Sequence, residues 1–136
     1  THNVLKKHED GRVWIHTGDY GYMTEDGVLY VMGRGLPERV GGGYLFALPM
    51  ENKVVDIPGV KDGFFVISVD AENEGYYLPY LYLVLEEGVE LEDVRESINN
   101  SLELHERPVQ ITVIDKRPFF HFKTNRRGLA AEIVKA

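Results

Sequence analysis

The sequence predicts an α+β fold, in which a small three-stranded sheet is covered by helices and preceded by a β-hairpin. Two helical patterns, at residues 49–57 and 91–102, have apolar residues at helical spacing. An Asp-Gly pair at residues 26–27 stands between two short apolar segments, which is a strong hairpin signal. Three further segments have the apolar or alternating composition of strands: residues 64–69, 80–85 and 109–113.

The first third of the chain has the composition of turns and short strands. We interpret residues 13–15 as a short strand and residues 20–32 as a hairpin. Residues 33–43 hold five glycines, one proline and three charged residues, so they lack the apolar side chains that a core needs. This composition is typical of a linker or a mobile loop. Residues 1–34 therefore look like a β-rich remnant of another structural unit.

The remainder predicts an alternation of helices and strands. Pro49 occupies the first turn of the first helix, where its missing N–H is not needed, and Pro58 follows the helix end. Pro108 closes the second helix, and residues 126–136 predict a short terminal helix. From residue 44 onward the expected order is α-β-β-α-β-α.

Composition excludes several classes of protein. A length of 136 residues, 43% of them hydrophobic, is enough for a core and argues against disorder. Lys and Arg number 15 against 22 Asp and Glu, a formal charge of −7 that argues against a general nucleic-acid or anionic-membrane binder. No cysteine is present, which excludes disulfides, thiolate metal sites and cysteine nucleophiles. No apolar run reaches the ~18 residues of a membrane span, and with no signal-peptide layout at Thr1 we expect a cytoplasmic protein.

Generic catalytic motifs do not explain the sequence. The five histidines are scattered, so we expect no metal site, and neither a phosphate-binding P-loop nor a Gly-x-Ser-x-Gly elbow occurs. Taken alone, Asp19 is typical of a turn residue and Arg34 of a solvated loop charge. The basic group around Lys123 is likewise typical of a solvated face.

One continuous stretch carries a specific pattern. From Trp14 to Gly21 the chain reads Trp-Ile-His-Thr-Gly-Asp-Tyr-Gly, followed by Glu-Asp-Gly-Val-Leu-Tyr at 25–30 and Gly-Arg at 33–34. This resembles the end of the large domain in adenylate-forming enzymes, which include acyl-CoA synthetases, peptide-synthetase adenylation domains and luciferases. The resemblance continues through Pro58-Gly59-Val60 to Lys123-x-x-Arg126-x-x-Leu129, and so covers residues 12–133.

The resemblance implies roles for individual residues. Asp19 matches the aspartate that accepts hydrogen bonds from the ribose hydroxyls of ATP and AMP, a task that suits an acceptor-only carboxylate. Arg34 matches the arginine that reaches the ribose and phosphate side. Lys123 matches the catalytic lysine that bridges the substrate carboxylate and the α-phosphate, with Lys116 as the reserve candidate.

Two further segments acquire roles from the same resemblance. The small domain of these enzymes rotates about a hinge, which here corresponds to Gly35, Leu36 and Pro37. After rotation a glycine loop lines the tunnel for the thiol acceptor, and here it corresponds to Gly41, Gly42 and Gly43. The chain departs from the family pattern where Leu36 replaces the usual Asp or Lys and where Phe122 replaces the glycine before the lysine.

The resemblance also predicts a domain organisation and an activity. We expect residues 1–34 to end the large AMP-binding domain, residues 35–43 to form the hinge and glycine loop, and residues 44–136 to form the small mobile domain. The full enzyme is expected to be an ATP-dependent carboxylic acid:CoA ligase, active for example in fatty acid metabolism, that makes an acyl-adenylate and then a thioester. The isolated chain is expected to be inactive.

The expected partners follow from that activity. They are the chain's own N-terminal domain, ATP and AMP with Mg²⁺ held in that preceding part, a carboxylic acid, and coenzyme A as co-substrate. Nucleic acid and a membrane span are not expected. Two alternatives remain at this stage: a peptide-synthetase adenylation domain that loads a carrier-protein phosphopantetheine, and a non-catalytic binding or regulatory module that retains the fold.

Overall fold

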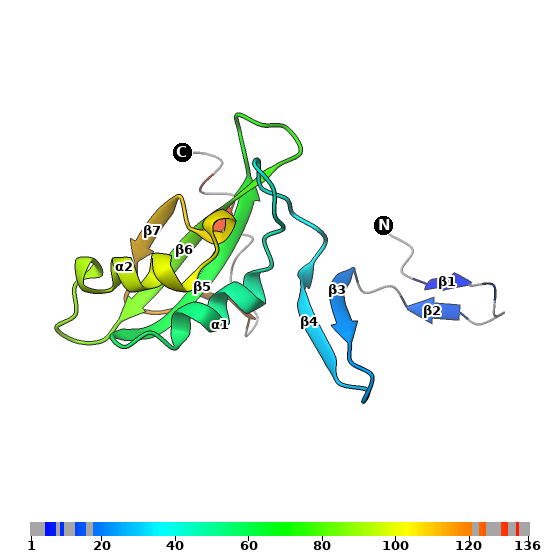
Figure 1. Cartoon of the computed structure of the whole chain (residues 1–136), viewed down its shortest axis with the longest axis horizontal. Helices are drawn as coiled ribbons and strands as arrows, with labels where there is room; N and C mark the ends of the chain where they lie inside the picture. The colour runs from blue at the N-terminus through cyan, green and yellow to red at the C-terminus, as the bar shows by residue number, and fades with distance from the viewer. Residues whose placement is uncertain are drawn as a thin grey trace. The chain divides into compact units, whose positions relative to one another are not determined.

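The computed structural model divides the chain into two units, Thr1–Gly35 and Leu36–Ala136, which we describe separately. Figure 1 shows the order of their elements. The residues that the structure describes are 5–7, 9, 13–15, 18–120, 123–124, 129–130 and 133.

The first unit consists of two antiparallel strand pairs. Strand β1 (Leu5–Lys7) pairs with β2 (Val13–Ile15), and β3 (Asp19–Met23) pairs with β4 (Leu29–Arg34). The turn of the second hairpin is closed by the N–H of Thr24, which donates to the carbonyl of Val28 at 2.9 Å. The predicted hairpin is therefore confirmed and extends slightly beyond residues 20–32, whereas β1 was not predicted.

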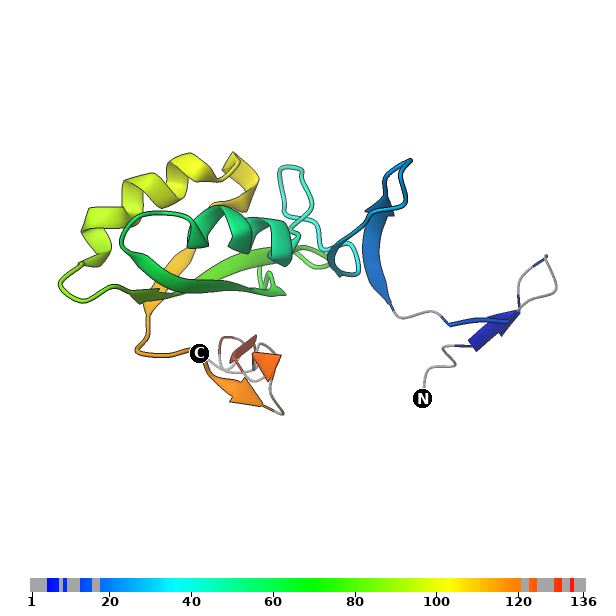
Figure 2. The same cartoon turned by 90° about the horizontal axis from the view of Figure 1, so that it is seen from below.

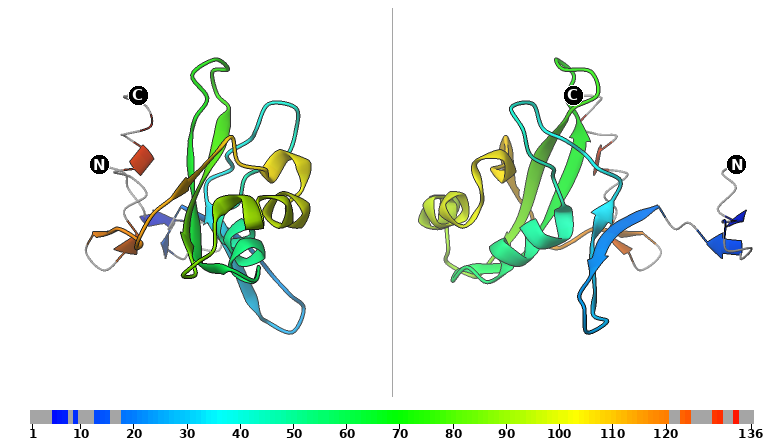
Figure 3. Two further views of the ribbon diagram at one scale, coloured as in Figure 1. Left: turned by 90° about the vertical axis from the view of Figure 1, so that its left-hand side faces the viewer. Right: turned by 45° about the vertical axis from the view of Figure 1, so that its right-hand side comes forward.

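The second unit contains the predicted three-stranded sheet. Its strands lie in the order β5 (Val60–Val69), β6 (Tyr77–Leu85) and β7 (Gln110–Val113), with β5 antiparallel and β7 parallel to the central β6. Helices α1 (Ala47–Val55) and α2 (Leu91–Ser101) both cover one face of this sheet (Figures 2 and 3). The α+β prediction is confirmed. The elements are α1 (Ala47–Val55), β5 (Val60–Val69), β6 (Tyr77–Leu85), α2 (Leu91–Ser101), η1 (Leu104–Glu106), β7 (Gln110–Val113), β8 (Phe119–Phe120) and β9 (Lys123–Thr124).

The core lies between that sheet face and the two helices. Phe65 on β5 and Leu81 on β6 are opposite partners in the ladder, and both are fully buried. The carboxylate of Glu51 on α1 accepts the backbone N–H of Phe65 at 3.1 Å, so the helix also satisfies a polar group of β5. The buried cluster comprises Leu45, Met50, Val54, Ile57, Val60, Phe65, Leu81, Leu83, Val94, Ile98 and Leu102.

The opposite sheet face is organised around Arg117. Its guanidinium makes two hydrogen bonds to the Asp62 carboxylate, at 2.9 and 2.6 Å, and lies 5.0 Å from the centre of the Phe64 ring. Phe64 in turn stacks on Tyr82, with ring centres 5.3 Å apart. The bonds from Arg117 lower the pKa of Asp62 below its ordinary 3.8. The forked pair therefore ties the chain just before β8 to the start of β5.

Replacing Arg117 by leucine should destabilise the sheet by about 1–2 kcal/mol, because the Asp62 carboxylate loses two charge-assisted hydrogen bonds. The pKa of Asp62 is lower in the folded protein than its ordinary 3.8. The stabilisation by the Arg117–Asp62 pair is therefore present above pH 3.8 and is lost as the pH falls through the folded-state pKa. The deficit should thus be full at about pH 7 and shrink once the pH falls below 3.8, as measured by amide exchange in β5 and β6. Arg95→Leu is the control, since its exposed pair with Glu92 is worth less than about 0.5 kcal/mol; an equal deficit in both variants would contradict this prediction.

The segment of residues 33–43, whose composition is typical of a linker or mobile loop, is hydrogen-bonded over most of its length. Residues 33–34 belong to β4. Residues 37–45 form a closed turn, in which the backbones of Glu38 and Tyr44 form an isolated antiparallel β-bridge. The N–H of Leu45 donates to the Pro37 carbonyl at 2.8 Å. Leu45 then enters the core. Backbone hydrogen bonds and one buried side chain order this segment, which its composition did not indicate.

Two other predictions have a limited outcome. Leu129, Ala130 and Ile133 are helical, but most of the expected terminal helix at residues 126–136 lies outside the described residues. Within the described part of the chain, no helix is long and apolar enough to cross a membrane.

Candidate functional site

The hairpin of β3 and β4 brings Asp19 and Arg34 together. They are direct partners in the antiparallel ladder, at the open end of the hairpin opposite its turn. Paired positions of this kind have Cβ atoms about 4.5–5.5 Å apart on one face. Two residues separated by fourteen others in the sequence are therefore neighbours in the backbone ladder.

Glycines of the same motif shape this end of the hairpin. The strand register shifts between Tyr20 and Gly21, and a Cβ on Gly21 would overlap the backbone carbonyl oxygen of Tyr30. Glycine is therefore required for β4 to approach β3 this closely. Beyond the Asp19–Arg34 pair, the N–H of Gly35 donates to the Gly18 carbonyl at 3.3 Å, which closes the end of the ladder.

The expected hinge residues occur at the division between the units. Gly35 ends the first unit, while Leu36 and Pro37 begin the second. Leu36 is exposed, and the closed turn starts at the Pro37 carbonyl. The hydrogen bonds of the second unit thus begin at Pro37.

The expected thiol-acceptor loop, at Gly41, Gly42 and Gly43, forms the tip of the closed turn. The N–H of Arg39 donates to the Gly43 carbonyl at 3.0 Å, and the N–H of Gly42 donates to the Arg39 carbonyl at 3.1 Å. The side chain of Arg39 also donates hydrogen bonds to the backbone carbonyls of His105, in η1, and Arg107, at its end. Sequence reasoning missed Arg39, which in a glycine-rich segment gave no signal beyond its charge.

The lysine candidates lie in different local structures. The backbone of Lys123 lies in β9, where it pairs with Phe120 of β8. Lys116 lies in the exposed bend before this hairpin. Phe122 and Arg126, which belong to the same motif, lie outside the described residues. The β8–β9 hairpin was not predicted from the sequence.

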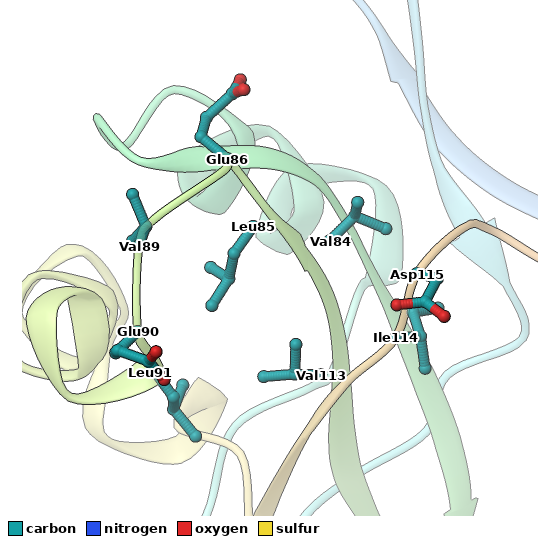
Figure 4. A pocket seen from close by; sticks show the side chains of 9 residues that line it. All are labelled: Val84, Leu85, Glu86, Val89, Glu90, Leu91, Val113, Ile114 and Asp115. Atoms are coloured by element: carbon teal, nitrogen blue, oxygen red, sulfur yellow. The ribbon is translucent and has the colours of Figure 1, made fainter.

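A depression on the second unit involves none of the predicted site residues (Figure 4). It lies where the end of β6, the start of α2 and the end of β7 meet. Its lining is Val84, Leu85, Glu86, Val89, Glu90, Leu91, Val113, Ile114 and Asp115. Among the described residues, no group of three or more His, Cys, Asp or Glu side chains could hold a metal ion.

Comparisons with known proteins agree with the fold and the hairpin. No model of a known protein family matches the chain. Over 106 residues it is 27% identical to 2-succinylbenzoate–CoA ligase from Oceanobacillus iheyensis and 30% identical to that from Listeria monocytogenes, covering 77% of this chain and 22% of each relative. The solved structure of o-succinylbenzoate CoA synthetase from Bacillus subtilis with its acyl-adenylate intermediate is 25% identical, with a TM-score of 0.70 over 90% of this chain and 25% of that one.

These similarities identify the class of protein. The small mixed sheet with two helices and the preceding hairpin form the C-terminal portion of an adenylate-forming enzyme. In sequence and fold the chain matches the C-terminal domain of the AMP-binding superfamily, and the curated relatives named above are 2-succinylbenzoate–CoA ligases. It spans about a fifth of the length of those relatives.

Proposed function

We propose that this chain is the C-terminal part of an AMP-forming acid:CoA ligase. In the first reaction a carboxylate attacks the α-phosphate of ATP, which forms an acyl-adenylate and releases pyrophosphate. In the second, the thiol of coenzyme A attacks the acyl carbon, which forms a thioester and releases AMP. The observation that carries the proposal is the pairing of Asp19 with Arg34 at the end of a glycine-shaped hairpin, in a chain that aligns with CoA ligases.

The proposed nucleotide site uses this pair. Asp19 would accept hydrogen bonds from the ribose hydroxyls, and Arg34 would bind on the ribose and phosphate side. Mg²⁺ would be held with ATP by residues of the part that precedes this chain. The described residues of this chain hold no metal-binding cluster of their own.

The proposed division of labour follows the two units. Residues 1–34 would complete the large domain, and residues 44–136 would form the small mobile domain that carries Lys123. Gly35, Leu36 and Pro37 would be the pivot between them, since the hydrogen-bonded turn begins only at Pro37. The chain alone would lack the acid pocket and would not turn over.

For the acid, we propose 2-succinylbenzoate as the first substrate to test, because the relatives named above act on it. A fatty acid is the second class, since the fold is shared with a fatty acyl CoA synthetase from Mycobacterium tuberculosis. The full-length protein, supplied with ATP, Mg²⁺, acid and coenzyme A, should release AMP and form a thioester. Thioester formation only on a carrier protein would instead support a peptide-synthetase adenylation domain, and no release of pyrophosphate with any acid would support a non-catalytic module.

Asp19→Asn tests the nucleotide site. Replacing one carboxylate oxygen by an amide removes a charged acceptor for the ribose hydroxyls, so kcat/KM for ATP should fall about 10- to 100-fold. The measurement is pyrophosphate exchange in the full-length protein. Glu25→Gln, in the exposed turn of the same hairpin, removes one charge as well and should leave this value unchanged. Equal effects of both substitutions would show that Asp19 acts only through general charge.

A further inference from the structure

The glycine loop is attached to the second unit by more than its chain ends. Residues 37–45 close on themselves through the Glu38–Tyr44 bridge and the bond from the Leu45 N–H to the Pro37 carbonyl. The carbonyl of Glu38 also accepts the N–H of Tyr77 at 2.9 Å, which joins the turn to the start of β6. The turn is therefore part of the sheet's hydrogen-bond network.

Arg39 fixes the turn to the segment after α2. Its Nη1 donates to the carbonyl of His105 at 2.8 Å and to the carbonyl of Arg107 at 2.7 Å. Both carbonyls belong to the short η1 helix or to its end, where carbonyls have no partner within the helix. Hydrogen bonds from a charged donor are stronger than those between neutral groups, and these two are partly buried. Figure 3 shows the turn, in cyan, beside the yellow end of this helical segment.

His105 holds the tip of the turn from the same segment. Its Nε2 lies 3.2 Å from the carbonyl oxygen of Tyr44. A Cβ on Gly43 would overlap the His105 ring, so the imidazole lies directly against the Gly43 backbone. Gly41 and Gly42 have open space at the same position, although all three glycines have φ near +100°. Only Gly43 therefore has both a conformational and a steric reason to be glycine.

We propose that Arg39 and His105 are positioning residues for the thiol-transfer step, which hold Gly41, Gly42 and Gly43 in the shape that accepts coenzyme A. This inference rests on the proposed function. A loop that is ordered before the acceptor binds does not have to lose conformational entropy during the reaction. The family resemblance assigns this loop to the thiol step, so adenylation should not depend on the anchor formed by Arg39 and His105.

Amide exchange in the full-length protein tests the anchor without any activity. Arg39→Ala should lower protection of the Gly42 and Leu45 amides about tenfold or more, because two charge-assisted bonds are lost. The amides of β5 and β6 should remain as protected as before. The matched control is Arg95→Ala, which removes the same charge from an exposed position on α2. Unchanged protection in Arg39→Ala would overturn the proposal.

A second set of variants isolates the His105 contact. Gly42→Ala and Gly43→Ala introduce the same positive-φ strain, but only the second also meets the imidazole. Protection of residues 38–45 should fall further in Gly43→Ala. Adding His105→Ala should restore part of that difference and should not help Gly42→Ala. If the two glycine variants behave alike, His105 does not position the loop.

The half-reactions then decide the role. Arg39→Ala should slow thioester formation from preformed acyl-adenylate about tenfold and leave pyrophosphate exchange at the wild-type rate. The control Arg95→Ala should leave both rates at the wild-type value. Equal loss in both half-reactions, or lost protection with an unchanged thiol step, would overturn the inference. If the wild-type protein makes no thioester with coenzyme A while Arg39→Ala still lowers amide protection of the turn, the proposed function fails. Arg39 would then stabilise the turn without any role in thiol transfer.

Discussion

Replacing Lys123 by alanine in the full-length protein is expected to slow acyl-adenylate formation by a factor of about 10²–10³, because the charge contact proposed to stabilise the transition state would be removed. Lys123 lies in β9, in a short hairpin that follows the Arg117–Asp62 ion pair. A lysine that acts only beside the α-phosphate contributes to the first half-reaction. Thioester formation from preformed acyl-adenylate should therefore be nearly unaffected, and the measurement is the ratio of the two half-reaction rates.

Lys116→Ala is the matched comparison. Lys116 is an exposed lysine seven residues earlier, in the bend before β8, so both variants remove one positive charge from the same region. Pyrophosphate exchange should survive Lys116→Ala. If it fails there and persists in Lys123→Ala, the alignment of the C-terminal motif is displaced and Lys116 is the catalytic lysine.

Local patterns in the sequence were sufficient to predict the sheet and both helices. The apolar run that contains Phe64 and Phe65 has residues buried on both faces of β5, and such a run is typical of a strand inside a protein. The Asp26-Gly27 pair correctly located the turn between β3 and β4. Strand ends were less well predicted, since β5 begins at Val60, four residues before the run of large apolar side chains.

The ordered turn at residues 37–45 could not be predicted in the same way. Glycine and charge content indicated mobility, but order comes from contacts with residues far along the chain. Arg39 bonds to carbonyls 66 and 68 residues away, and Tyr77 bonds to Glu38. Every residue has a backbone carbonyl, so the order of the side chains does not indicate which carbonyls Arg39 binds.

The candidate site was predicted in part. The motif resemblance named Asp19 and Arg34, and the hairpin pattern predicted two adjacent strands there. The direct ladder pairing of the two residues depends on the register shift at Gly21, because one extra residue on β4 changes which residues face each other. Such a shift arises from backbone geometry, which periodicity alone does not specify.

Phe65→Ala should have the largest effect on stability, about 3–5 kcal/mol, because a fully buried aromatic ring is lost at the centre of the core. Phe65 faces Leu81 across the ladder and lies between the sheet and both helices. Amide protection in β5 and β6 should fall by about a hundred-fold to a few thousand-fold, since about 1.4 kcal/mol corresponds to a factor of ten. Val69→Ala, at the end of the same strand with 52% of its surface exposed, should change protection little.

The kinetic consequence of Phe65→Ala separates stability from positioning. The sheet supports the turn of residues 37–45 through Tyr77 and supports the chain before β8 through Asp62. Loss of the ring makes the whole unit open more often, so both half-reactions should decline together as temperature rises. Their ratio should stay at the wild-type value, unlike the ratios expected for Lys123→Ala and Arg39→Ala, which change in opposite directions. A selective loss of one half-reaction in Phe65→Ala would mean that the core itself favours one of the two half-reactions.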